Sequence, residues 1–226
     1  REQSGHRHLK EIHMAVITKW SSVAVSVQSA LASAKTITAI TKANPGVVSS
    51  TAHGYSNGDY VLMTVQGMYQ VNYRVFRVSA VATDSFALEG EDTTNYATFS
   101  SGSCQKITFG TSLATLTNIN ASGGDFDFID TTTIHDSIKT QVPGLPNPSN
   151  YTFESFWDPS DSGLIALKSA SDSQAQRAIL FGFANGQKFV FNAYVGCSLA
   201  PTGSAQDLIK TSVTFTALGG SKSYSS

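Results

Sequence analysis

The sequence has 226 residues, of which 41% are hydrophobic and only 14% are charged, and its formal net charge is −1. A chain of this length can bury one large core or two small ones, and its nearly balanced charge argues against a general nucleic-acid-binding protein. No run of apolar residues approaches the roughly 20 that a membrane-spanning helix requires.

The first 13 residues, REQSGHRHLKEIH, are polar and include three histidines. We interpret residues 1–13 as a flexible N-terminal arm or an upstream extension, because such a segment has little to anchor it on a core. A metal site is the alternative reading, but histidine ligands need partners that orient their rings, and this segment supplies none. We therefore expect neither a metal nor a cofactor.

Residues 14–35 contain the first expected strand, in which Val23, Val25 and Val27 alternate with small or polar residues. From residue 36 to residue 108, short alternating segments such as 60–65 and 75–80 are separated by turn signals. Strands at intervals of about ten residues are typical of a small barrel or sandwich. We predict a small all-β barrel at residues 36–108.

Two features of the chain could be mistaken for catalytic groups. The pentapeptide GYSNG at residues 54–58 matches the hydrolase elbow, but that elbow requires a helix after its serine, and the following DYVLMTV predicts a strand. We therefore interpret Ser56 as a turn residue and His53 as a turn or packing residue. Cys104 and Cys197 are far apart and lack metal-ligand spacing. Nothing in the sequence indicates an enzyme.

The second half contains two alternating segments, 124–130 and 151–157, joined by a long connection rich in Thr, Ser and Pro. We predict that the two segments pair as neighbouring strands with one buried face and one polar face. The expected buried side chains are Phe126, Phe128, Phe153 and Trp157, and the expected polar-face acids are Asp125, Asp127 and Glu154. The connection at 131–149 is too long to be only a link within one domain.

A helix, a hairpin and a last strand are expected to follow. Asp158 predicts the helix N-cap and Pro159 its first position, with the helix running to about residue 171. The segments 178–183 and 188–201 surround an Asn-Gly turn and predict the hairpin. Alternation at 209–218 predicts the last strand.

Residues 36–108 resemble a β-barrel module that recurs in phage tail proteins, named after the first catalytic cysteine half-domain of ubiquitin-activating enzymes. The resemblance rests on residues 52–59, Gly67, Met68, Asn72, Phe76, Val78 and 84–88. These are turn and core positions, so the name implies no ubiquitin chemistry and no catalytic cysteine.

The rest of the chain resembles the tail tube protein of long-tailed phages with non-contractile tails, the family of the lambda major tail protein. The resemblance lies in the order and spacing of five stretches, namely 130–133, 142–148, 151–161, 186–195 and 210–219. The sequence departs from the simplest family members because residues 36–108 interrupt it.

The resemblance implies a mainly-β subunit: a β-sandwich at residues 14–35 and 109–226 with one flanking helix, plus the inserted barrel. It implies six subunits in a ring and rings stacked into a tube that conducts DNA from capsid to host. The expected partners are further copies, the tape measure protein, tail terminator and tip proteins, and passing double-stranded DNA without specific binding. The location implied is the virion tail, after assembly in the bacterial cytoplasm.

In this family the long loop reaches a neighbouring ring. The residues assigned to this inter-ring loop are Thr131, Thr132, Thr133, His135, Asp136, Ser137, Lys139, Gln141, Val142, Pro143, Gly144, Leu145 and Pro146. Sliding DNA favours a wall that repels phosphate, so Asp125, Asp127 and Glu154 are predicted to line the channel. The alternative is that these acids only keep an outer face soluble.

A second class of function is a phage decoration protein or a module that binds carbohydrate or the host surface. Four aromatic side chains of the barrel could serve such binding, namely Tyr55, Tyr69, Tyr73 and Tyr96. The competing interpretation is that they fill or edge the barrel. Self-assembly into rings or filaments would distinguish the two functions.

Overall fold

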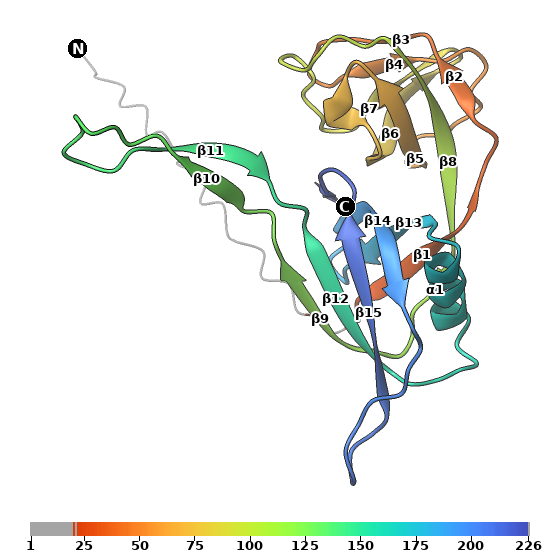
Figure 1. Cartoon of the computed structure of the whole chain (residues 1–226). Coiled ribbons are helices and arrows are strands. Elements are labelled where there is room, and N and C mark those ends of the chain that lie inside the picture. Colours follow the sequence, from red (N-terminus) through yellow and green to blue (C-terminus); the bar gives the residue numbers. More distant parts are fainter. Residues whose placement is uncertain (1–19, 21, 226) are drawn as a thin grey trace, which may run out of the picture.

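The computed structural model describes residue 20 and residues 22–225, so the N-terminal segment 1–13, which we expected to be flexible, lies outside the described residues. The described part consists mainly of antiparallel strands with one α-helix, which confirms the mainly-β expectation. Most strands follow one continuous path in the order β3-β4-β7-β6-β5-β8-β1-β13-β14-β15-β12-β9. This path is folded into an upper lobe and a body, from which a long hairpin projects (Figure 1).

The upper lobe comprises residues 35–104 and has its own core. Val61, Met63, Phe76, Phe86 and Leu88 are completely buried in it. Its elements are β2 (Lys35–Ile37), β3 (Ala39–Ile40), β4 (Val47–Ser49), β5 (Tyr60–Gln66), a 3-10 helix (Tyr69–Val71), β6 (Val75–Ala82), β7 (Ser85–Leu88) and the first part of β8 (Ser101–Ser112).

The body surrounds a second core, in which Phe153, Phe191, Phe215, Leu164 and Leu167 are buried together. The single described α-helix, α1, packs against β14 and β8. The elements of the body are β1 (Ala24–Leu31), β9 (Leu116–Ser122), β12 (Asn150–Phe156), α1 (Ser162–Asp172), β13 (Gln176–Gly182), β14 (Lys188–Cys197), β15 (Lys210–Ala217) and β16 (Lys222–Tyr224). The hairpin around the Asn-Gly turn and the last long strand are thus confirmed, whereas β9 and β16 were not expected from the sequence.

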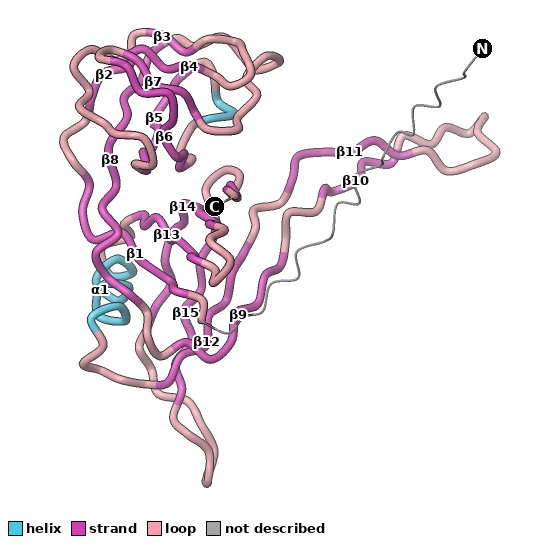
Figure 2. The backbone as a smooth tube through the Cα atoms, turned by 180° about the vertical axis from the view of Figure 1, so that it is seen from behind, coloured by secondary structure: helices cyan, strands magenta, loops and turns pink. Residues whose placement is uncertain are grey.

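The chain enters and leaves the upper lobe side by side. Lys35 pairs directly with Cys104, and the long strand β8 continues from there into the body, where it pairs with β1. Figure 2 shows this pair of connections along one side of the molecule. An excursion that leaves and returns at one place disturbs the rest of the fold little.

The helix begins later than the sequence predicted. The carboxylate of Asp161 accepts a hydrogen bond from the Leu164 N–H at 2.9 Å and is the N-cap, whereas Asp158 closes a turn by accepting from the Ser160 N–H at 2.9 Å. Both aspartates have capping chemistry, so packing decides between them. A methyl group on Gly163 would lie 2.5 Å from Leu113 Cδ2, so the helix enters the body where only glycine fits.

The expected pairing of residues 124–130 with 151–157 is wrong. The strand β10 (Phe126–Asp130) pairs with β11 (Gln141–Pro146), which lies within the expected loop, while β12 pairs with β9 on one side and β15 on the other. Because both edges of β12 are occupied, it has no edge left for β10. Phe153 is buried as expected, but Phe126 and Phe128 are exposed and Trp157 lies at the surface.

Candidate assembly site

The hairpin of β10 and β11, residues 126–146, projects away from the body and is called the arm (Figures 1 and 2). Its large apolar side chains are open to solvent, with Phe128 63% exposed and Leu145 86% exposed. The exposed apolar residues of the arm are Phe126, Phe128, Ile129, Ile134, Ile138, Val142 and Leu145. A two-stranded hairpin with no covering layer is marginally stable in water, so burial of these side chains against another surface would stabilise the arm.

The tip of the arm is held by its own polar residues. Asp136 accepts hydrogen bonds from the N–H and the hydroxyl of Thr133 at 2.8 and 2.9 Å, and the Thr131 N–H donates to Thr140 O at 2.9 Å. These bonds from Thr133 lower the pKa of the Asp136 carboxyl below its ordinary value. Ile134 is 96% exposed at the tip.

The root of the arm contains two glycines that set its direction. Gly123 and Gly124 have φ values of +80° and +84°, a region that residues with a Cβ rarely adopt. A methyl group on Gly123 would lie 2.4 Å from Pro148 O. The Asn147 side chain crosses the root and donates to the Asp127 carboxylate at 3.0 Å. The arm is therefore anchored to the ends of β9 and β12.

The three acids predicted to line a channel do not share one strand pair. Asp125 and Asp127 lie at the root of the arm, whereas Glu154 lies on β12 within the body sheet. Glu154 faces Lys210 of β15, with Oε2 and Nζ 3.8 Å apart. The structure thus separates Glu154 from the two aspartates and gives it a cationic neighbour.

The outward face of β9, β12 and β15 is almost free of charge. Along it, Thr152 lies between Asn120 and Thr214, and Asn150 lies between Ser122 and Thr216. The outward residues of these strands are Asn118, Asn120, Ser122, Asn150, Thr152, Glu154, Phe156, Lys210, Ser212, Thr214 and Thr216, of which only Glu154 and Lys210 are charged. This face could not be predicted from the sequence, because the asparagines of β9 weaken its strand signal.

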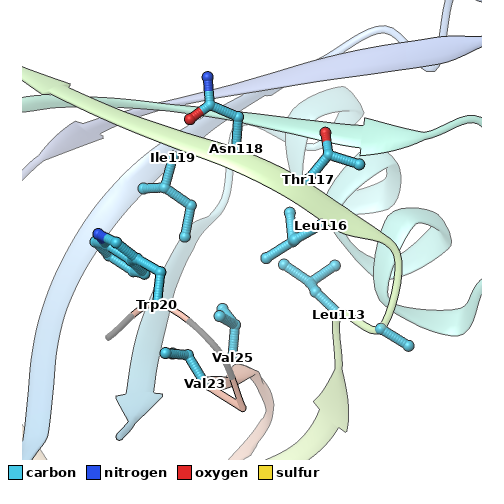
Figure 3. A pocket seen from close by; sticks show the side chains of 9 residues that line it. Trp20, Val23, Val25, Leu113, Leu116, Thr117, Asn118 and Ile119 are labelled. Carbon is cyan, nitrogen blue, oxygen red and sulfur yellow. The ribbon is translucent and has the colours of Figure 1, made fainter. Parts of the chain in front are cut away.

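The sheet leaves a pocket of about 270 Å3, lined by apolar residues together with Thr117 and Asn118, between β9 and the start of β1. Figure 3 shows Leu116 and Ile119 of β9 across from Trp20 and Val23. The Trp20 ring contacts the edge of Phe181, with centroids 6.4 Å apart, yet 63% of the residue is exposed. The side of β9 away from β12 pairs with no described strand, so the pocket lies beside an open sheet edge.

A second exposed apolar surface lies at the loop between β14 and β15. Leu208 and Ile209 are exposed there, and Phe156 lies beside them. The Trp157 indole N–H donates to Leu199 O at 2.9 Å and ties β12 to the base of this loop. Figure 1 shows the loop at the opposite end of the body from the upper lobe.

The residues that could suggest catalysis have packing roles. His53 is buried and lies between the carbonyls of Ala82 and Ser85, and the strand β5 begins soon after Ser56, with no helix. Cys104 and Cys197 are free and are buried in separate cores. Among the described residues no group of His, Cys, Asp or Glu could hold a metal ion, and no helix there is long and apolar enough to cross a membrane.

A search of curated proteins found no match. A model of the family described as phage tail tube protein matches residues 66–226. The match begins at the end of β5 and includes the arm, the pocket strand β9, the low-charge face and the whole of the chain after them. It spans well over half of the chain. The chain therefore belongs to the phage tail tube proteins, structural components of the virion tail that assemble into a tube with other tail proteins.

Proposed function

We propose that the protein forms hexameric rings that stack head to tail into a tube conducting DNA, in a long non-contractile tail of the lambda type. A repeated contact between two different surfaces generates an open filament. The observation that carries this proposal is the arm, because a projecting apolar hairpin is explained by a neighbouring subunit. In the proposed tube the arm reaches the next ring.

The arm presents apolar side chains on both of its faces. Phe128 lies opposite Pro143 on one face, and Ile129 lies opposite Val142 on the other. Burying one such side chain stabilises a contact by about 1.5–3 kcal/mol. The arm therefore fits between surfaces of neighbouring copies better than it fits flat on one of them.

The low-charge face of β9, β12 and β15 is the surface that we assign to the channel wall. Hydroxyl and amide groups offer DNA little charge, so no counterions are released when the phosphates pass. Glu154 belongs to this wall with its charge balanced by Lys210. Asp125 and Asp127 would add negative charge at the rim, where the arm leaves the sheet.

The upper lobe is proposed to stand on the outside of the tube. It coincides, within a few residues, with the inserted barrel domain predicted at residues 36–108, which is similar to the phage tail module named above. The body, residues 14–35 and 109–226, would form the ring. Supporting this division, each part has its own core and the chain crosses between them at one place. The tape measure, terminator and tip proteins are the further partners proposed, with assembly in the host cytoplasm.

A decoration or surface-binding module is the second candidate. Tyr69 and Tyr73 favour it, because both are exposed on the upper lobe, whereas Tyr55 is buried against Phe86. A tube subunit could also have this binding function only if its upper lobe lies on the outside of the tube.

Electron microscopy of the purified protein at increasing concentration tests the proposal. We expect tubes with a central channel and sixfold rings in projection. Rings of another symmetry would refute the hexamer while leaving the tube. A protein that stays monomeric at millimolar concentration, with the arm intact, would favour the surface-binding module instead.

A further inference from the structure

The end of the chain lies between the upper lobe and the body, on the side away from the two connections (Figure 1). The short strand β16 adds to the edge of β14, with Lys222 opposite Val190 and Tyr224 opposite Lys188. Its backbone thus belongs to the body. Its side chains make their polar contacts with the upper lobe.

Lys222 reaches a buried carboxylate of the upper lobe. Its Nζ lies 2.6 Å from Glu91 Oε2 and 2.7 Å from Gly90 O. Glu91 also receives hydrogen bonds from Arg74 at 2.6 Å and from the Tyr96 hydroxyl at 2.7 Å, and its side chain is only 4% exposed. A buried charge is stable only when it is paired and hydrogen-bonded. Lys222 is therefore part of a complete network and is more than a surface ion pair.

Tyr224 makes the second contact. Its hydroxyl accepts a hydrogen bond from the Arg77 backbone N–H at 2.8 Å, and the Arg77 guanidinium lies over its ring, 4.7 Å from the centroid. The ring is buried in a small third core that joins the two parts. This core contains Leu62, Val75 and Ile107 from the upper lobe and β8, and Ala178, Val190 and Tyr224 from the body.

The two glycines that precede β16, Gly219 and Gly220, also contact the upper lobe. The Arg74 Nε–H donates to Gly220 O at 3.2 Å. Gly219 has a φ of +71°, and a methyl group there would lie 2.8 Å from Arg74 Cγ. Arg74 thus contacts both the Glu91 carboxylate, which Lys222 also binds, and the turn at Gly219 and Gly220, which precedes Lys222.

We propose that residues 219–225 form a latch that fixes the orientation of the upper lobe on the body. The two chain connections run side by side, so they can bend and twist together as a hinge. The latch closes the opposite side of that hinge and removes the motion. Asn192 adds one direct bond across the gap, from Nδ2 to Tyr73 O at 3.1 Å, but the lysine that completes the ion network and the aromatic ring under Arg77 both come from the C-terminal segment.

The distance between two spin labels, at Asn95 of the upper lobe and Ser169 of α1, tests the latch. Both side chains are exposed, and both native cysteines are buried and protected from labelling. The full chain with labels should give one narrow distance distribution. Lys222→Met combined with Tyr224→Phe should widen it at least twofold, and deletion of residues 219–226 should widen it further. Lys168→Met, which removes a surface ion pair with Asp172, is the matched control and should leave it narrow.

An unchanged narrow distribution in the double variant would overturn the latch. If circular dichroism shows that the deletion variant does not fold, the single variants Lys222→Met and Tyr224→Phe test the latch instead. Each of them must then widen the distance distribution. Labelled protein is diluted in unlabelled protein, so that only distances within one subunit are measured. The result is then independent of tube formation, and a failure of the proposed function would leave this test intact.

Discussion

At the scale of single residues, Glu91 connects parts of the chain that are far apart in sequence. Its burial alone would favour the protonated acid, but Lys222, Arg74 and Tyr96 stabilise the carboxylate more strongly, and its pKa lies below the ordinary value of 4.5. A group with a lowered folded-state pKa stabilises the fold above its unfolded-state pKa, and this contribution is lost as the pH falls through the lowered value.

Glu91→Gln should therefore destabilise the protein most at neutral pH. Removing one partner of a buried ion pair costs about 3–5 kcal/mol, because Arg74 and Lys222 are left without a counter-charge. The difference from wild type should be constant from pH 7 to pH 6 and should shrink below pH 4.5. Urea unfolding at pH 7, 6, 5 and 4 measures it. A difference that does not change with pH would mean that the carboxylate charge is unimportant. Glu154→Gln, at a half-exposed pair, is the control and should cost less than about 1 kcal/mol.

At the scale of elements, the arm shows how local pairing and assembly depend on each other. Its strands are joined by a turn of its own residues, so it can form without any other strand. Its side chains, however, are buried by no described part of the chain. The same phenylalanines that predicted a core strand are therefore available for contacts with other copies, and the proposed assembly would bury them.

Serine substitutions on either face of the arm should abolish tubes and leave the monomer folded. The variants are Phe126→Ser with Phe128→Ser on one face, and Ile129→Ser with Val142→Ser on the other. At about 1.5–3 kcal/mol per side chain, each pair should raise the protein concentration needed for assembly by more than 100-fold. Sedimentation and electron microscopy measure this, with Ile165→Ser, an exposed residue of α1, as control. If one of the two double variants assembles normally, the face that it alters is not in contact with another copy, and only the opposite face of the arm is buried in the tube.

At the scale of the whole molecule, one subunit has surfaces of three characters. The arm and the loop between β14 and β15 are apolar and project in different directions, the face of β9, β12 and β15 is polar with little charge, and the upper lobe stands apart. In the proposed tube, the apolar surfaces would contact other copies, and the low-charge face would line the channel without binding DNA. These assignments make the tube wall neutral, and not acidic as the sequence suggested.

Lysines introduced on the proposed wall should slow DNA without preventing assembly. Asn120→Lys and Thr214→Lys lie on either side of Thr152 and are both exposed. Each lysine that meets a phosphate releases a counterion, so DNA release from variant particles should be slower, and salt should restore it. Ser169→Lys on α1 adds the same charge elsewhere and should have no effect. An unchanged release rate in the double variant would place this face away from the channel.

Much of the fold could be predicted because the signals involved are local. The alternation around the Asn-Gly turn specified β13 and β14, the alternation near the end specified β15, and Leu164 and Leu167 marked the buried side of α1. Each of these signals depends on residues within one element or one turn. Their order along the chain was enough to indicate the tail tube family, which the family match confirms.

The tertiary structure alone decided which surfaces meet. Alternation shows that the two faces of β10 differ, but whether Phe126 and Phe128 are buried depends on what approaches them, and β12 had no free edge to offer. Asp158 and Asp161 have the same capping chemistry, and the close contact of Gly163 with Leu113 selected Asp161. The Gly/Ser-rich end has little strand signal, and it became β16 because Lys222 and Tyr224 met partners more than 100 residues away. Long-range contacts of this kind are set by the packing of the whole chain, which no local pattern contains.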